Sequence, residues 1–179
     1  MSKTALLIID VQRAFFDGDP IAAVYDGDRV LERISSVVQR ARLAGLPLVY
    51  VQHIGAVGHP LEPQGKGWQI HPEVRPQEAD LVIGKTRPDS FYGTNLQADL
   101  DLLDAKKLIV MGNQTDFCID TTCRRARSFD YEVTLLHDAH STWDNKHLKA
   151  RQIIDHHNFV LGRQFVSLVD SSRVDFERL

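Results

Sequence analysis

Short apolar runs recur along the chain and are separated by amphipathic segments. The runs are rich in Val, Ile and Leu and mostly lack alternation, as in strands covered on both faces. They predict strands at Ala5 to Ile9, Pro47 to Val51, Asp80 to Ile83, Lys107 to Met111, Glu132 to Leu136 and Gln164 to Leu168. Amphipathic spacing predicts helices at Val30 to Ala44, Gln97 to Leu103, Cys118 to Ser128 and Asn145 to Asn158. Strands alternating with helices indicate an α/β domain with a mainly parallel sheet.

One stretch, Ile54 to Glu78, breaks this rhythm. It holds most of the prolines and several glycines, with Trp68 and His71 among them. Loops this long in a compact domain are usually functional or disordered, so we expect this one to fold over a pocket. No composition shift marks a second unit, and the length of 179 residues suits a single domain spanning 1–179.

Composition and charge narrow the class of function. Apolar residues make up 43% and charged residues 25% of the chain, with a formal net charge of -3. This balance argues against nucleic acid or an anionic membrane as a partner, because both favour clustered Lys and Arg. No apolar run approaches the roughly 18 residues that cross a bilayer. The two cysteines fit a reducing compartment, so we expect a cytoplasmic protein with a small-molecule substrate.

Three reactive side chains follow predicted strands. Asp10 ends the first strand, Lys85 follows the third, and the segment Gly112 to Cys118 follows the fourth and opens a helix. Ligands of open parallel sheets bind beyond the carboxyl ends of the strands, so acid, base and thiol should meet at one edge. Taken singly, Asp10 also fits a turn or cap residue, Lys85 a solvated loop residue and Cys118 a small buried apolar residue.

The chemistry of the three groups is coherent. A helix N-terminus and a nearby ammonium both stabilise thiolate, so we expect the pKa of Cys118 to lie low enough for ionisation near neutrality. Asp10 would take or return a proton, and backbone amides from Gln114 to Cys118 would face a developing oxyanion. Nucleophile, proton carrier and oxyanion donors are the parts that acyl transfer requires.

The chain resembles the isochorismatase-like cysteine hydrolases over nearly its whole length. The motifs that carry the resemblance are Leu6 to Gln12 (LLIIDVQ), Gly84 to Leu96 (GKTRPDSFYGTNL), Gly112 to Thr122 (GNQTDFCIDTT) and, less specifically, His156 to Asn158. The resemblance implies a three-layer fold with a six-stranded, mainly parallel sheet and helices on both faces. It also implies a catalytic triad of Asp10, Lys85 and Cys118. A non-proline cis peptide between Asn113 and Gln114 would shape an oxyanion hole from the amides of Gln114 and Cys118.

The family includes nicotinamidases, carbamoyl and ureido amidohydrolases, and isochorismatases that cleave a vinyl ether. The last typically lack the cysteine, so Cys118 favours an amide, carbamoyl or ureido substrate. Nicotinamidases carry an Asp-x-His pair after the second strand, which is absent here because Val51 precedes Gln52 and His53. His53, His59 and His71 remain as zinc candidates, but without the carboxylate we interpret them as loop and pocket residues and expect no metal and no cofactor.

Several expectations remain open. Vinyl-ether hydrolysis through Asp10 is the first alternative function, and a non-catalytic binding protein on the same scaffold is the second. The resemblance implies a homodimer or homotetramer, and Trp68 and Ile70 are candidate contacts with a neighbour. The predicted substrate-binding residues are Gln12, Phe15, Phe16, Trp68, Tyr92, Asn113 and Phe117.

Overall fold

Six parallel strands form one sheet in the order β3-β2-β1-β4-β5-β6 in the computed structural model, which describes residues 3–176. The strands are β1 (Lys3–Ile9), β2 (Leu48–His53), β3 (Leu81–Lys85), β4 (Ala105–Asn113), β5 (Glu132–Ser141) and β6 (Ser167–Val169). The sheet and the fold class are as predicted. The order reverses between β1 and β4, which is where open α/β sheets place their ligands.

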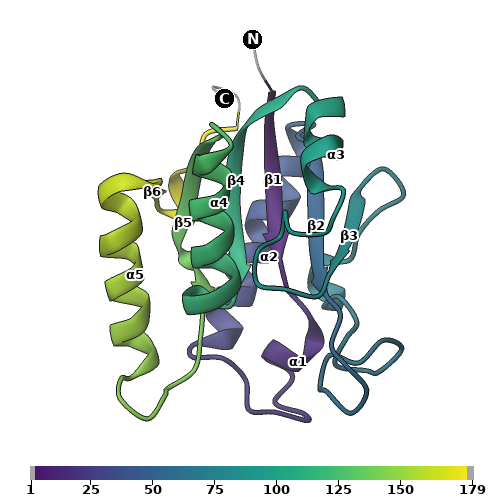
Figure 1. Cartoon of the computed structure of the whole chain (residues 1–179), viewed down its shortest axis with the longest axis vertical. Coiled ribbons are helices and arrows are strands. Elements are labelled where there is room, and N and C mark those ends of the chain that lie inside the picture. The colour runs from purple at the N-terminus through teal and green to yellow at the C-terminus, as the bar shows by residue number, and fades with distance from the viewer. Residues whose placement is uncertain (1–2, 177–179) are drawn as a thin grey trace.

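Helices cover both faces of the sheet (Figure 1). They are α1 (Arg13–Phe16), α2 (Gly27–Leu43), α3 (Leu96–Leu102), α4 (Asp120–Ser128) and α5 (Ala150–Gln164). Successive side chains of β1 enter opposite cores: Leu6 and Ile8 pack with α2, whereas Leu7 and Ile9 pack with α3 and α4. Burial on both faces explains why β1, β2 and β4 read as continuous apolar runs, whereas the edge strands β3 and β6 are partly exposed.

Two predicted boundaries near the C-terminus were wrong. The predicted helix Asn145 to Asn158 is α5, which begins only at Ala150 because the Asn145 side chain accepts the N–H groups of His147 and Leu148 in a turn. The helix then continues to Gln164, and the N–H groups of Phe165 and Val166 both bond the Leu161 carbonyl. The predicted strand at Gln164 to Leu168 therefore shifts to β6.

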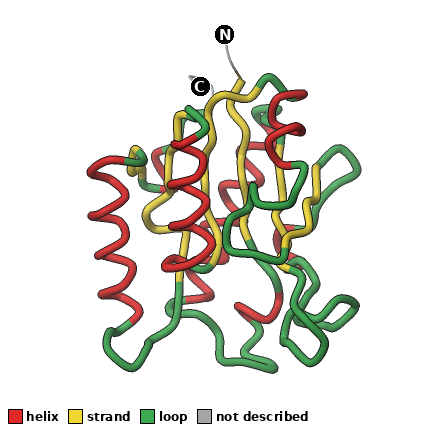
Figure 2. Tube along the Cα trace, viewed as in Figure 1, coloured by secondary structure: helices red, strands yellow, loops and turns green. Residues whose placement is uncertain are grey.

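Two features bring the ends of the central strands together. Gly112 in β4 has φ 120°, and a Cβ there would lie 1.9 Å from the Ile9 carbonyl oxygen, so only glycine allows this approach to β1. β5 bulges between the residues paired with Val110 and Gly112, which places His140 beside Gly112. Loops that follow the strands gather at the lower end of the molecule in Figure 2.

Within residues 3–176, no helix combines the length and the apolar character needed to cross a membrane. The compartment, the single-domain boundary and self-association stay predictions. Ile70, one of the two candidate contacts with a neighbour, packs against the core of its own chain.

Candidate active site

The three candidate catalytic side chains come from separate strand ends. Asp10 follows β1 directly with φ 51°, and Lys85 is the last residue of β3. Cys118 lies in η2 (Thr115–Ile119), a five-residue π-helical turn between β4 and α4. The peptide bond between Asn113 and Gln114, immediately before this turn, is cis. The edge of the sheet thus collects an acid, a base and a thiol from distant parts of the chain.

These side chains are in direct contact. Lys85 Nζ lies 2.7 Å from Asp10 Oδ2 and 3.1 Å from Cys118 Sγ. Exposed fractions are only 1% for Asp10, 2% for Lys85 and 8% for Cys118, so solvent does not screen the contacts. Asp10 Oδ1 is buried without a hydrogen-bond partner. A carboxylate oxygen is therefore available to accept a proton or an N–H group.

The electrostatics differ from the sequence-based expectation for the thiol. Burial and, to a smaller extent, the Asp10 carboxylate raise the pKa of Cys118 to about 12, although Lys85 lowers it. The expectation of thiolate near neutral pH was wrong, because the sequence does not reveal how deeply this group is buried. Burial lowers the pKa of Lys85, but Asp10 and Cys118 outweigh that effect and hold it above its usual value. In the resting state a charged Lys85 therefore lies beside a neutral thiol.

The lysine ammonium stands where a metal ion would be bound. Asp10, His53 and Cys118 offer ligand atoms that lie within 4.8 Å of one another, the one such group among residues 3–176. Lys85 Nζ contacts the first and third and lies 3.4 Å from His53 Nδ1. The three histidines weighed as zinc ligands do not converge, because His71 lies in a different hollow from His53 and His59.

A pocket of about 370 Å³ opens onto Cys118. Its lining comprises Asp10, Phe15, Ile21, His53, His59, Pro60, Leu61, Pro88, Gln114, Phe117, Cys118 and Trp143. Phe15 and Phe117 were predicted to line it. The long loop contributes through His59, Pro60 and Leu61, which confirms that its first part folds over a pocket.

The other predicted pocket residues do not line this cavity. Gln12 is fully buried, and its Nε2 donates to the carbonyls of His53 and Trp68. Asn113 is also fully buried, with Nδ2 3.4 Å from the Asp10 carbonyl oxygen. The Trp68 carbonyl accepts a hydrogen bond from Gln12, and Trp68 is not among the residues that line the pocket. Phe16 lines a separate hollow, and Tyr92 is exposed.

Sequence reasoning missed a polar network behind the nucleophile turn. Thr115 Oγ1 lies 2.9 Å from His140 Nδ1, and His140 Nε2 lies 3.0 Å from Asn158 Oδ1. Asn158 Nδ2 donates to the His137 carbonyl at 3.0 Å, which fixes the direction of every bond: His140 donates to Asn158 and accepts from Thr115. Burial lowers the pKa of His140 to about 4, so the ring is neutral. The motif His156 to Asn158 hinted at part of this network.

A second chain of hydrogen bonds holds the same turn from its other side. Gln114 Nε2 donates to Thr142 Oγ1 at 3.0 Å, and Thr142 Oγ1 donates to Asp116 Oδ1 at 2.6 Å. Together with the Thr115–His140 contact, these bonds tie η2 to the end of β5. The turn that carries Cys118 is therefore anchored by side chains on both sides.

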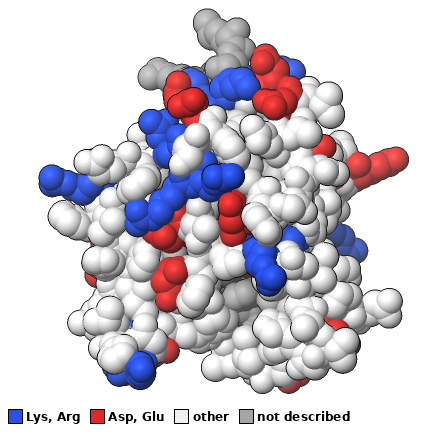
Figure 3. Space-filling model, viewed as in Figure 1, with Lys and Arg blue, Asp and Glu red and all other residues white. Residues whose placement is uncertain are grey.

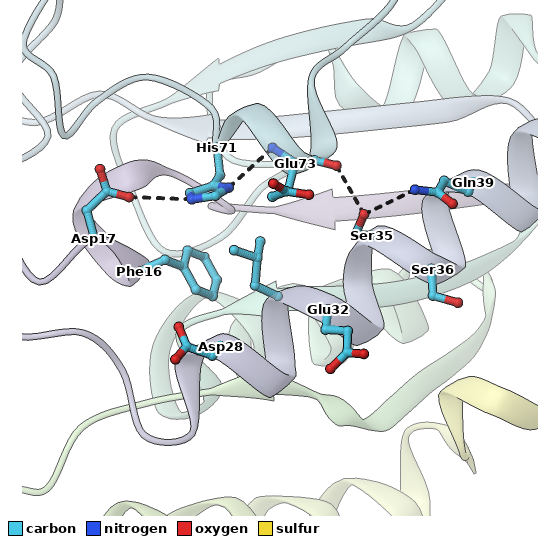
Figure 4. Close-up of a pocket in the computed structure, with 10 residues that line it drawn as sticks. Phe16, Asp17, Asp28, Glu32, Ser35, Ser36, Gln39, His71 and Glu73 are labelled. Carbon is cyan, nitrogen blue, oxygen red and sulfur yellow. Dashed lines mark hydrogen bonds and ion pairs between the residues drawn. The ribbon is translucent and has the colours of Figure 1, made fainter.

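A larger hollow of about 590 Å³ lies elsewhere, beside α2 (Figure 4). Carboxylates surround it: Asp17, Asp28, Glu32 and Glu73. His71 Nε2 lies 3.4 Å from Asp17 Oδ1, and His71 Nδ1 accepts the Glu73 N–H at 3.3 Å. It contains no cysteine, serine–histidine contact or buried ion pair among its lining residues.

This chain is similar to proteins of the isochorismatase domain family. A model of the isochorismatase domain matches residues 4–157. A streptothricin hydrolase of Streptomyces noursei is 40% identical over 78% of this chain and 50% of its own length. A ureidoacrylate amidohydrolase of Variovorax paradoxus is 27% identical, over 77% and 68% respectively. The chain thus spans about half the length of the first of these relatives.

Solved structures agree with the sequence comparison. The crystal structure of an isochorismatase from Pseudomonas putida superposes with a TM-score of 0.92 and 30% identity, covering 96% of this chain and 90% of that one. Nearly the whole of this chain therefore shares the fold of that structure.

Proposed function

We propose that this chain, which belongs to the isochorismatase domain family, is a cysteine hydrolase that cleaves a C–N bond of a small amide, carbamoyl or ureido substrate. The observation that carries the proposal is the buried contact of Lys85 Nζ with both Asp10 and Cys118 at the floor of a pocket. The names of the two hydrolase relatives support the same reaction class.

The first half-reaction begins from a neutral thiol. Asp10 Oδ1, which has no partner, takes the proton of Cys118 as Sγ attacks the substrate carbonyl carbon, so thiolate forms only as the new C–S bond forms. Lys85, which is paired with Asp10, stabilises negative charge on sulfur. The oxyanion is placed against the backbone N–H groups of Gln114 and Cys118.

The tetrahedral intermediate then expels the amine. Asp10 returns its proton to the leaving nitrogen, the C–N bond breaks, and an acyl group remains on Cys118 as a thioester. Water attacks this thioester while Asp10 accepts one of its protons. The C–S bond breaks, the acid is released, and the proton passes back to sulfur, which restores the starting state.

Ammonia release from a panel of small amides and ureides tests the proposal. Cys118→Ala should lower the turnover by on the order of 10³-fold or more, because the nucleophile acts in both half-reactions. Cys123→Ala is the matched control, since Cys123 is a buried free thiol on α4 outside the pocket. A mass increase equal to the acyl group on Cys118, trapped by acid quench, would support the thioester.

Other outcomes point to the alternatives. Full turnover of a vinyl-ether substrate by Cys118→Ala, together with loss of that turnover in Asp10→Asn, would indicate vinyl-ether hydrolysis through Asp10 alone. Absence of turnover in the wild-type protein across amides, ureides and vinyl ethers would favour a binding protein.

A further inference from the structure

We propose that the substrate of this site carries no negative charge, and that an apolar, flat acyl portion lies between the rings and aliphatic groups of the pocket wall. This narrows the amide, carbamoyl and ureido compounds of the proposed function, on which it rests, to those without an anionic group. Anionic ureido and carbamoyl acids are excluded.

The wall of the pocket is apolar and partly rigid. Phe15 and Trp143 stack with ring centroids 5.4 Å apart, and the Trp143 Nε1 donates to the Ala22 carbonyl at 2.7 Å. Ile21, Leu61 and Phe117 supply further apolar surface. Flat apolar groups gain by leaving water for such a surface, whereas a carboxylate there would lose hydration without recovering it.

No positive charge among the lining residues is free to meet an anion. Lys85 lies beneath the pocket and already contacts Asp10 and Cys118. Burial, with Lys85 adding to it, lowers the pKa of His53, which keeps that ring neutral. His59 Nδ1 accepts the Leu61 N–H at 3.0 Å, so this nitrogen carries no proton.

The charge that does line the pocket is negative. Asp10 lies at the floor of the cavity, and its buried Oδ1 has no hydrogen-bond partner. A substrate carboxylate would therefore lie near the Asp10 carboxylate, and the one cation beneath the pocket, Lys85, is already paired with Asp10. Figure 3 shows few charged side chains on the lower part of the visible face, where the loops after the strands lie. Arg87 precedes the lining residue Pro88, but it is exposed and not part of the lining.

Alkylation with two reagents of nearly equal size tests the charge preference without any substrate. Iodoacetamide is neutral and iodoacetate is anionic, and glutathione gives their intrinsic rate ratio. The iodoacetamide to iodoacetate rate ratio at Cys118 should exceed the glutathione ratio by about tenfold or more, equivalent to 1.4 kcal/mol of discrimination. Ile21→Lys, which adds an ammonium to the partly buried wall, should bring the ratio back toward that of glutathione, and Ile21→Met should not.

A ratio at Cys118 equal to or below that of glutathione would overturn the proposal. So would a faster reaction with iodoacetate that is lost in Arg87→Gln, since Arg87 would then be the counter-ion of an anionic substrate. Comparing hydrolysis of benzamide with that of 4-carboxybenzamide adds a turnover readout, in which benzamide is the expected substrate. Labelling selectivity does not depend on hydrolysis, so a failed proposed function shows itself separately, as unchanged turnover in Cys118→Ala.

Discussion

Two hollows of this molecule differ in the burial of their charged side chains, and the larger hollow is the one whose charges are more exposed. The hollow beside α2 is the larger, at about 590 Å³, and carboxylates surround it. Three of its four acids, Asp28, Glu32 and Glu73, are exposed, and the fourth, Asp17, is paired with Arg13 and His71. The pocket at the carboxyl edge of the sheet measures about 370 Å³ and is mostly apolar, yet its floor holds the buried Asp10–Lys85 pair.

The two hollows differ in how far water screens their charged side chains, and this difference indicates which of them can support catalysis. Three of the acids at the α2 hollow are exposed, so water and salt screen their interactions. Charges under the smaller pocket are held out of water by the fold, and their interactions are correspondingly strong. Buried titratable groups at strand ends therefore locate the site better than the volume of a cavity does.

The strongest test of this contrast is the loss of Lys85. Lys85→Met should lower the free energy of unfolding by about 3–5 kcal/mol, because it leaves the Asp10 charge buried without a partner. Lys66→Met is the matched control, since Lys66 is an exposed partner of Asp17, 3.8 Å away, and should cost less than about 1 kcal/mol. Urea unfolding measures both.

A double variant sharpens this result. Adding Asp10→Asn to Lys85→Met should recover most of the lost stability, because no buried charge remains. Equal losses for Lys85→Met and Lys66→Met would contradict the view that the two regions differ electrostatically.

The network behind the pocket predicts a pH-dependent stability. The His140 pKa is about 4 in the folded chain against 6.5 when unfolded. Between pH 6.5 and about 4, His140 binds a proton in the unfolded chain but not in the folded chain. The contribution of neutral His140 to the free energy of unfolding is therefore complete above pH 6.5 and is lost as the pH falls to about 4. The loss should reach about 3 kcal/mol over this window. His140→Gln should flatten this part of the curve, whereas His156→Gln, an exposed α5 residue, should preserve it.

A smaller effect is expected on the reactivity of Cys118. Asp10→Asn should lower the Cys118 pKa, because it removes a carboxylate that disfavours thiolate and leaves Lys85 in place. Iodoacetamide labelling near pH 8 should accelerate by about tenfold, the effect of one pKa unit. Asp17→Asn changes an acid of the α2 hollow and should leave the rate unaltered. A slower reaction in Asp10→Asn would mean that Asp10 promotes ionisation of the resting thiol.

The smallest expected effect concerns the α2 hollow itself. Glu32→Gln should leave turnover unchanged and shift the free energy of unfolding by less than about 0.5 kcal/mol, as exposed substitutions usually do. Loss of turnover in this variant would show that the larger hollow takes part in function.

The sheet and the triad were accessible from sequence for the same reason. Parallel strands appear as apolar runs whose last residues lie at the carboxyl edge of the sheet. This located Asp10 after the buried strand β1 and Lys85 at the end of the edge strand β3. The end of the chain was harder, because Phe165 and Val166 are apolar residues that close a helix and do not open a strand. Local composition does not separate these two roles.

The walls and supports of the site depend on contacts that no local pattern encodes. Ile21 and Trp143 reach the pocket from connections far apart in the sequence, and His140 reaches Thr115 only because β5 bulges. Their side chains look like ordinary loop and strand residues. The raised pKa of Cys118 was missed for a related reason, since it reflects depth within the fold.

Gly112 has a consequence for how such a protein can diversify. Its backbone lies against the Ile9 carbonyl with no side chain between them, so main-chain atoms set the spacing between the acid after β1 and the turn after β4. The side chains that shape the pocket, such as Ile21 and Leu61, belong instead to connecting segments. Exchange of those segments can alter which molecule is accepted while the reacting atoms keep their separation. Selection for new substrates and selection for catalytic geometry therefore act on different parts of the chain.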